Sequence, residues 1–471
     1  MEVSATTTSD GVRTCAGDHL FPEQFSPWPA TDSVDLPAPG EPSFIEKCRL
    51  IRERLLTCLT SPSIGLPPVD IVNKCIDLYM RYTFPTAPLV HEPTLREAAS
   101  LFFSDPAPQD PFHADSYGGR VARVRLFSLV TGMCASIASV TPAHLLACRQ
   151  RFAEAFLSAS RETLLSFELY DMEHPVSMSL AIRAFQSTAM QQNTGKFGAA
   201  WHIHSQACLL AQDLRLYSEE AVRRHDPLEA RLLRLNFWHL YTADKAAAAF
   251  RTRPFTLHET LFDEDLTLEP GGDKSFSLLC RPVQVENGTL EERFLIGFHL
   301  IRRIWSSAYR LLSSLRAYRK QTEEVKSRLG EEYLDFMGLM NDLPSWLRIS
   351  GIISSRDAGG LDTECKPSFW VQRCTIVVTF YCLRLVILQQ CVDSDAHDVA
   401  GLHKDQGSAI LTKKLEMVQD FVQALEDIPF IYLQVKGEPN VSSVAVPPKS
   451  RLLLTNPRRK GYGESGLFFS S

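Results

Sequence analysis

The sequence predicts an all-α fold, and three observations lead to that prediction. Apolar residues recur at spacings of three and four along most of the chain, as they do on one face of a helix. Residues that start and stop helices separate these apolar runs. No convincing period-two alternation, no internal repeat and no G-x-G-x-x-G turn after a strand occurs. We therefore expect a multi-helix protein.

The composition favours a globular protein without a global attraction to nucleic acid. The chain has 471 residues, 45% of them hydrophobic, and a formal charge of −6 from 49 basic and 55 acidic side chains. Its length suggests about two to four domains. The start MEVSATTTSD has no apolar signal region, and the most apolar span, CTIVVTFYCLRLVILQQC, contains Arg384 and is too short to cross a bilayer. We expect no membrane contact and no secretion.

The twelve cysteines never form a C-x-x-C pair. Metal knuckles need such short spacing, and disulfide scaffolds are small and secreted. We expect reduced, mostly buried thiols in a cytosolic or nuclear protein.

Three regions are expected along the chain. Residues 1–43 contain six prolines among polar residues and predict a disordered arm, residues 44–435 predict one helical domain, and residues 436–471 predict a disordered tail. Within the domain, FIEKCRLIRERLLTCL predicts the first helix. Asp70 is expected to N-cap DIVNKCIDLYMRY.

Residues that start or stop helices indicate where the following helices lie. Thr141-Pro142 is expected to start a helix and Gly195 to end one. Asp226 as N-cap, Pro227 at the first position and Glu229 at capping-box spacing predict a helix from about 227 to 250. Apolar residues wrap most of its circumference, which is typical of a helix packed between others.

A long polar loop is expected at 263–289. Thr289 and Glu292 then repeat the capping-box spacing before a long amphipathic helix. Further helices are expected at about 331–343, 368–391 and 408–427.

The stretch RLNFWHLYTADKAAAAFRTRPFTL places charges along and just beyond an apolar helix. Asp244 is expected to be partly buried, and a buried carboxylate needs a partner. Arg251 and Arg253 are the nearest candidates in sequence. We interpret the group, with Lys245, as a structural clamp on the turn, the alternative being a catalytic acid at Asp244.

No metal site is expected. His202 and His204 project from a helix about 200° apart and cannot share an ion. His204 and Cys208 have workable i, i+4 spacing, but no third ligand lies near them in the sequence. The short basic clusters are interpreted as solvated helix ends, except that Pro457-Arg458-Arg459-Lys460 is a candidate nuclear-import patch.

Residues 228–270 resemble the signature of the fungal-specific transcription factor domain, also called the middle homology region, of the binuclear zinc-cluster transcription factor family. In that family an arginine-rich helix with Trp, Tyr and Asp leads to a Gly-Arg-Pro turn and an acidic segment ending in proline. The residues that match are Arg231, Arg234, Trp238, Tyr241, Asp244, Arg253 and Pro254. CIDLYMRYTFPTAPLVHEPTLREA and AWHIHSQACLLAQDLRLYSEE resemble two further family segments in the same order, so the resemblance covers about residues 70–270.

Several positions depart from the family pattern. Thr252 replaces the usual glycine, Lys245 the usual arginine, and Arg215 a glycine. Residues 1–69 lack the six-cysteine C-x2-C-x6-C zinc cluster that reads DNA in the family.

The resemblance implies a nuclear transcriptional regulator, not an enzyme, that controls transcription by RNA polymerase II. Its helical domain would respond to a metabolite effector or a partner protein, with no cofactor and no catalytic residue in this chain. The cysteine spacing, in turn, predicts no stoichiometric zinc. DNA contact would be weak or indirect, through a zinc cluster missing from this chain, a zinc-cluster partner or a basic patch. The expected protein partner is a zinc-cluster transcription factor or a second copy of the chain in a homodimer. The competing class is a small-molecule-binding or enzymatic helical protein without a role at DNA.

Overall fold

A computed structural model describes residues 43–60, 65–104, 110–250, 252–263, 266, 276–285, 288–318, 323–354, 361–402 and 407–435. The chain divides into the units Met1–Ser43 and Phe44–Ser471, and every described helix and strand belongs to the second unit. Apart from Ser43, the expected arm lies outside the described residues, as does the expected tail at 436–471.

The prediction of an all-α fold is confirmed. The described residues form 16 α-helices, which are α1 (Phe44–Leu59), α2 (Pro68–Tyr82), α3 (Glu92–Phe103), α4 (Tyr117–Val140), α5 (Arg149–Leu165), α6 (Glu168–Glu173), α7 (Ser177–Thr194), α8 (Phe197–Asp213), α9 (Glu219–Arg223), α10 (Pro227–Ala249), α11 (Leu290–Ala317), α12 (Glu323–Gly338), α13 (Ile349–Ser354), α14 (Leu361–Asp393), α15 (Gly407–Glu426) and α16 (Phe430–Gln434). Four 3₁₀-helices are η1 (Phe84–Thr86), η2 (Glu259–Leu261), η3 (Ser345–Leu347) and η4 (His397–Ala400). The strands β1 (Gln284–Val285) and β2 (Gly288–Thr289) pair antiparallel in a minimal hairpin.

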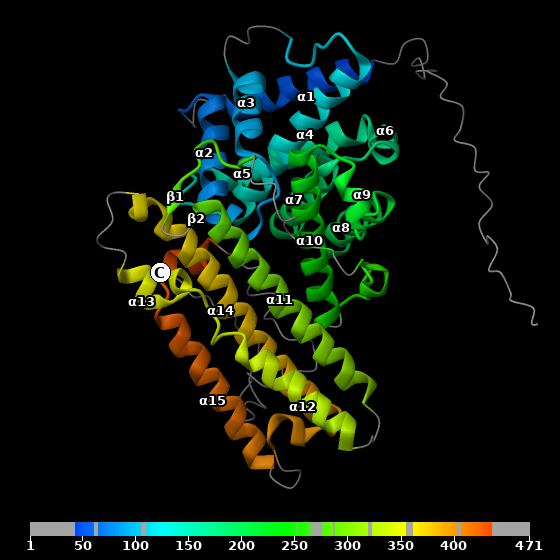
Figure 1. Cartoon of the computed structure of the whole chain (residues 1–471). Coiled ribbons are helices and arrows are strands. Elements are labelled where there is room, and N and C mark those ends of the chain that lie inside the picture. The colour runs from blue at the N-terminus through cyan, green and yellow to red at the C-terminus, as the bar shows by residue number, and fades with distance from the viewer. Residues whose placement is uncertain are drawn as a thin grey trace, which may run out of the picture. The chain divides into compact units, whose positions relative to one another are not determined.

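Helix α4 lies at the centre of the N-terminal half of the domain, packed against α5 and α7 (Figure 1). A buried polar network joins the three helices. Ser128 of α4 and Ser160 of α5 each donate a hydroxyl hydrogen bond to the other's carbonyl oxygen, at 3.0 and 2.7 Å. Gln186 of α7 donates to the Ser160 hydroxyl at 2.9 Å. Because each buried polar group has a partner, the network fixes the relative register of the helices.

A second buried polar cluster surrounds Asp171 of α6. Its carboxylate lies 2.8 Å from Nε of Arg125 and 2.6 Å from Nη1 of Arg183, and it also accepts the hydroxyl of Ser179 at 2.7 Å. The two arginines come from α4 and α7. The short helix α6 is thereby held against the two long helices by charge-assisted hydrogen bonds.

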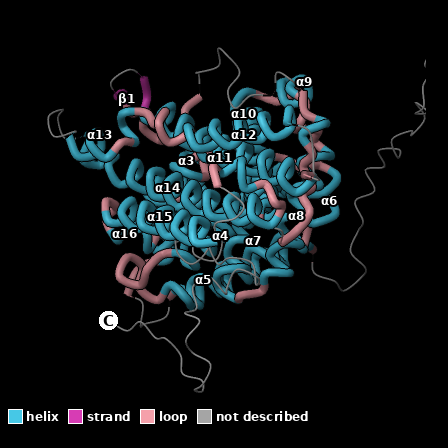
Figure 2. Tube along the Cα trace, turned by 90° about the horizontal axis from the view of Figure 1, so that it is seen from below, coloured by secondary structure: helices cyan, strands magenta, loops and turns pink. Residues whose placement is uncertain are grey.

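In the C-terminal half, α11 packs against α10, α12 and α14, and α14 packs against α15 (Figures 1 and 2). Gln372 of α14 donates from Nε2 to the carbonyl oxygens of Pro85 and Phe294, at 2.5 and 2.8 Å. Its amide lies against Gly297 of α11, where a Cβ atom would collide with it. A glycine at this position therefore permits the close approach of α11 and α14.

Three of the expected helix boundaries are confirmed. Gly195 ends α7 with φ 64°, in the left-handed region that glycine adopts readily. The Asp226 side chain caps α10 by accepting from the amide of Glu229 at 3.1 Å. Thr289 and Glu292 form the expected reciprocal capping box at the start of α11. The expected helices at 331–343, 368–391 and 408–427 correspond to α12, α14 and α15 with shifted ends.

Two expected helix starts are wrong. Helix α2 begins at Pro68 with Pro67 at the N-cap, so Asp70 lies within the first turn, where its charge suits the positive end of the helix dipole. Thr141 is the C-cap of α4, and Pro142 opens a turn in which Leu145 and Leu146 donate to its carbonyl oxygen. The next helix, α5, begins only at Arg149.

Two described helices are long and apolar enough to span a membrane by length and composition alone. They are Tyr117–Val140, whose apolar window is 83% buried, and Lys366–Asp393, whose window is 50% buried. The second includes the apolar span at 374–391, which alone is too short to cross a bilayer. Helix α14 extends beyond that span, so the longer helix reaches the required length. Core helices of soluble proteins satisfy the same criterion, and Arg384 within α14 lies 3.3 Å from Asp420 of α15.

The expected burial of most cysteines is confirmed for the described residues. Ten described cysteines are free thiols, and seven of them are buried: Cys48, Cys75, Cys134, Cys208, Cys374, Cys382 and Cys391. Burial raises the pKa of Cys382 to about 12, so this thiol is protonated and unreactive near neutral pH.

Candidate functional site

Helix α10 carries most of the residues that the sequence analysis singled out. It packs against α7, α8, α9 and α11, and buried residues occupy most of its circumference, as the sequence predicted. Its N-terminal half holds two buried ion pairs. Arg234 pairs with Glu219 of α9, and Arg231 lies 3.0 Å from Glu291 of α11 while donating to the Phe276 carbonyl oxygen at 2.6 Å. These two arginines therefore anchor neighbouring elements on α10.

Asp244 is fully buried, but its expected pairing with Arg253 is wrong. The Oδ2 atom accepts the backbone amides of Thr256 and Leu257 at 2.7 and 2.9 Å. Arg253 and Pro254 are exposed, and Arg251 lies outside the described residues. Burial raises the pKa of Asp244, and the two amide hydrogen bonds oppose that rise. The carboxylate thus holds the turn through backbone amides, which a sequence pattern of charges does not reveal.

Lys245 is also fully buried, and its ammonium group lies among aromatic rings. The Nζ atom is 3.9 Å from the ring centre of Phe255, 4.1 Å from that of Tyr309 and 5.0 Å from that of Tyr241. Its nearest carboxylate oxygen belongs to Glu259, at 3.6 Å. Burial lowers the pKa of Lys245, and Glu259 opposes that effect. Contacts with three aromatic rings and one carboxylate offset the free-energy cost of removing the ammonium group from water.

Beside this lysine, a cavity of about 710 Å³ opens between α10, η2, α11 and α12. This effector pocket, as we call it, is within the size range of small-molecule sites. Its lining residues are Trp238, Tyr241, Glu259, Phe262, Arg302, Arg303, Ser306, Ser307, Arg310, Leu334, Asp335, Gly338, Leu339 and Asp342.

Arg302 forms the best-defined polar wall of the effector pocket. Its guanidinium stacks 4.3 Å from the ring centre of Trp238, and its Nε atom is buried without a hydrogen-bond partner among the described residues. Burial lowers the pKa of Arg302, although a guanidinium remains charged at any physiological pH. Its Nη2 atom lies 3.3 Å from Nδ1 of His299, and the charged guanidinium that lines the pocket can attract a carboxylate or phosphate.

The remaining charges of the pocket lie on two facing helices. Arg303 and Arg310 line it from α11, whereas Asp335 of α12 and Asp342, just beyond that helix, line it from the other side. Tyr241 donates its hydroxyl to Glu259 and shares a 3.0 Å hydrogen bond with Ser306. The pocket thus offers cations on one wall and carboxylates on the other, an arrangement that suits a polar ligand carrying both charge signs.

The structure brings together some of the sequence-predicted residues and separates others. Trp238 and Tyr241 both line the effector pocket, whereas Arg253 and Pro254 are exposed on the turn and do not. The arginines of α11 were not among the predicted site residues. Arg302, Ser306 and Arg310 recur every four residues on the polar side of this amphipathic helix, so the signal was present in the sequence.

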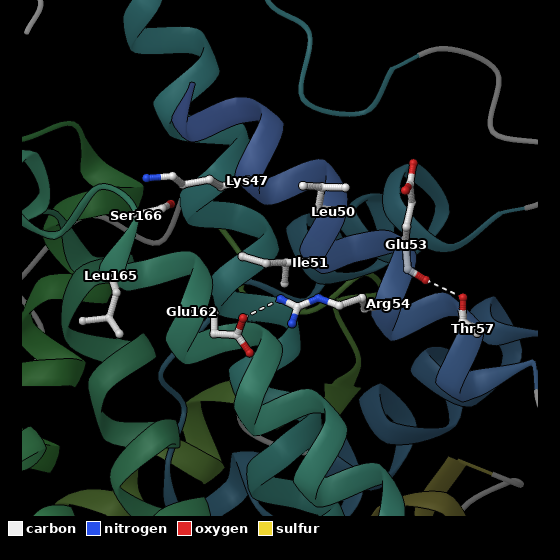
Figure 3. A pocket seen from close by; sticks show the side chains of 9 residues that line it. All are labelled: Lys47, Leu50, Ile51, Glu53, Arg54, Thr57, Glu162, Leu165 and Ser166. Atoms are coloured by element: carbon white, nitrogen blue, oxygen red, sulfur yellow. Dashed lines mark hydrogen bonds and ion pairs between the residues drawn. The ribbon is translucent and has the colours of Figure 1, made fainter. Parts of the chain in front are cut away.

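A second hollow, of about 880 Å³, lies between α1 and α5 (Figure 3). The ion pair between Arg54 and Glu162 crosses it, and both side chains are largely exposed, at 64% and 41%. Leu50 and Leu165 on its rim are exposed too. This open hollow holds no unpartnered buried polar group among its described lining residues, so the effector pocket is the stronger candidate site.

Comparisons with family models, curated proteins and solved structures find no match for this chain.

Proposed function

We propose that the chain is a nuclear transcriptional regulator of the fungal-specific transcription factor type, and that its helical domain responds to a small polar metabolite. The proposal rests on the resemblance of residues 228–270 to the family signature and on the position of two signature side chains. Trp238 and Tyr241, both on α10, line the effector pocket. A ligand there would contact the signature helix directly.

The observation that carries the effector assignment is the state of Arg302. Its charged guanidinium stacks on Trp238 and lines the cavity, where it can attract an anionic group. Asp335 and Asp342 on the opposite wall favour a cationic group on the same ligand. We therefore propose an effector that carries a carboxylate or phosphate and an amine.

Contact with DNA would be indirect. The formal charge of −6 gives no global attraction to phosphates, and residues 1–69 have no cysteine cluster. We propose that a zinc-cluster partner or a zinc cluster outside this sequence supplies the DNA contact. The chain alone should bind DNA weakly, without sequence preference and with steep loss on adding salt.

A ligand-binding screen tests the effector pocket. Full-length protein is titrated calorimetrically with amino acids, amines and phosphorylated or dicarboxylic metabolites. Arg302→Gln should weaken binding of the tightest ligand by about 10- to 100-fold, the cost of one charged hydrogen bond. The exposed Arg253→Gln variant is the matched control and should bind as the wild type does. Equal affinity of all three proteins would refute the pocket assignment.

Two further measurements distinguish regulation from the competing enzymatic class. Occupancy of specific promoters in chromatin, together with nuclear residence, would support the regulator. Turnover of the bound metabolite, lost in Arg302→Gln, would instead support an enzyme without a role at DNA.

A further inference from the structure

Three buried side chains with metal-ligand chemistry meet where α8 packs against α10. His204 and Cys208 lie one turn apart on α8, and Asp244 projects from α10. Their ligand atoms all lie within 4.8 Å of one another, and the Nε2 atom of His204 is 3.5 Å from the Sγ atom of Cys208. Local sequence spacing offers the histidine and cysteine no third ligand, because Asp244 is distant in the chain.

One atom of this cluster lacks an explanation within the protein. The Oδ2 atom of Asp244 accepts two backbone amides, whereas its Oδ1 atom is buried and has no hydrogen-bond partner among the described residues. Asp244 is 0% exposed, so water at the surface does not satisfy this oxygen. A buried carboxylate oxygen without a partner is strongly unfavourable, and a cation would remove the penalty.

We propose that His204, Cys208 and Asp244 bind one zinc ion. Imidazole nitrogen, thiolate sulfur and carboxylate oxygen are the three donor types found in protein zinc sites. Zinc bonds of about 2.3 Å to sulfur and about 2.0 Å to nitrogen, at tetrahedral angles, place those two atoms about 3.5 Å apart. The observed separation of the sulfur and nitrogen atoms is the same. A water molecule would complete the tetrahedron.

Charge balance favours the same ion. On binding, the Cys208 thiol releases its proton to solvent, so thiolate and carboxylate together contribute two negative charges. A divalent ion neutralises the two anionic ligands. Calcium and magnesium prefer all-oxygen ligand sets, so the imidazole and thiolate select zinc over both.

The ion would connect three parts of the fold. Its ligands come from α8 and α10, and Asp244 also holds the amides of Thr256 and Leu257 in the turn after α10. None of the three ligands lines the effector pocket, so the zinc site is independent of the proposed effector. The ion would stabilise the turn that leads into Glu259 of the pocket.

Cobalt(II) and zinc(II) are the probes for this site. Metal-free full-length protein is prepared with a chelator and titrated with cobalt, whose thiolate charge-transfer band reports sulfur ligation. We expect one equivalent to bind with tetrahedral cobalt bands, zinc to displace it, and zinc to raise the unfolding midpoint. Cys208→Ser should abolish the charge-transfer band, and His204→Gln should weaken binding at least about tenfold.

Matched controls lie on the same helix and in the same core. His202 of α8 is exposed and Cys382 is a buried thiol of α14 outside the cluster, so His202→Gln and Cys382→Ser should bind metal as the wild type does. Circular dichroism of each metal-free variant checks that it folds. The proposal is overturned if the wild type binds less than one equivalent, or if Cys208→Ser, folded, retains the wild-type band.

Discussion

The turn after α10 gives a sharp test of how Asp244 acts. In the structure its carboxylate accepts two backbone amides, from Thr256 and Leu257, and Arg253 is exposed. Hydrogen bonds to charged groups contribute about 1.5–3 kcal/mol each, so Asp244→Ala should lower the free energy of unfolding by about 3–6 kcal/mol. Asp244→Asn should cost less, at about 1–2 kcal/mol, because an amide oxygen still accepts and the buried charge is gone.

A double-mutant cycle with Arg253 separates this account from an ion pair. Arg253→Met should change the free energy of unfolding by no more than about 0.5 kcal/mol, and its coupling to Asp244→Asn should be near zero. The assay is denaturant unfolding followed by circular dichroism, with chelator present so that bound metal does not contribute. A loss of about 3 kcal/mol or more of unfolding free energy in Arg253→Met, partly recovered in the double variant, would show that Asp244 and Arg253 pair. That result would refute the account in which Asp244 holds the turn through backbone amides.

Three other predictions concern packing, pH and buried charge. Gly297→Ala should lower the free energy of unfolding by about 1–3 kcal/mol, because the new Cβ atom would collide with Gln372. The control, Gly330→Ala on an open helix surface, should leave stability unchanged or raise it. Equal effects of the two changes in denaturant unfolding would contradict this prediction. Burial and the neighbouring arginines lower the pKa of His299 to about 4, so the unfolded chain binds this proton more tightly. Stability should fall as the pH drops from about 6.5 to 4, and His299→Gln should flatten that dependence in unfolding curves recorded across the range. Asp171→Asn removes the negative charge that pairs with two buried arginines and should lower the free energy of unfolding by about 3–5 kcal/mol. Arg224→Met breaks an exposed ion pair and should lower it by under about 1 kcal/mol. Similar losses in the two variants would refute the distinction between buried and exposed pairs.

Sequence periodicity and capping residues predicted the helices well where a single local interaction decides the boundary. Gly195, Asp226 and the Thr289–Glu292 box act within one turn, so their effect is visible in the sequence. The predicted helix starts at Asp70 and Thr141 were wrong. Pro67 is the N-cap of α2, so Asp70 lies in the first turn, and Thr141 is the C-cap of α4. Residue types that suit helix ends do not specify which end they will occupy.

The candidate sites were only partly predictable because they depend on packing between distant elements. Asp244 was correctly placed in a buried position, yet its partners are backbone amides, which carry no sequence signature. Asp335 reaches the effector pocket from α12 only after α12 packs on α11. Asp244 joins His204 and Cys208 only through the contact between α8 and α10. Local sequence spacing therefore predicted the helices but not which residues of different helices come into contact.

A reporter assay tests the central claim, that this helical domain regulates transcription in response to a metabolite, most directly. The full chain is fused to a heterologous DNA-binding module and expressed with a reporter gene. We expect reporter expression to differ from that of the module alone and to change with the metabolite that binds the effector pocket. Arg302→Gln should abolish that response. Expression equal to that of the module alone, with and without the metabolite, would contradict the account.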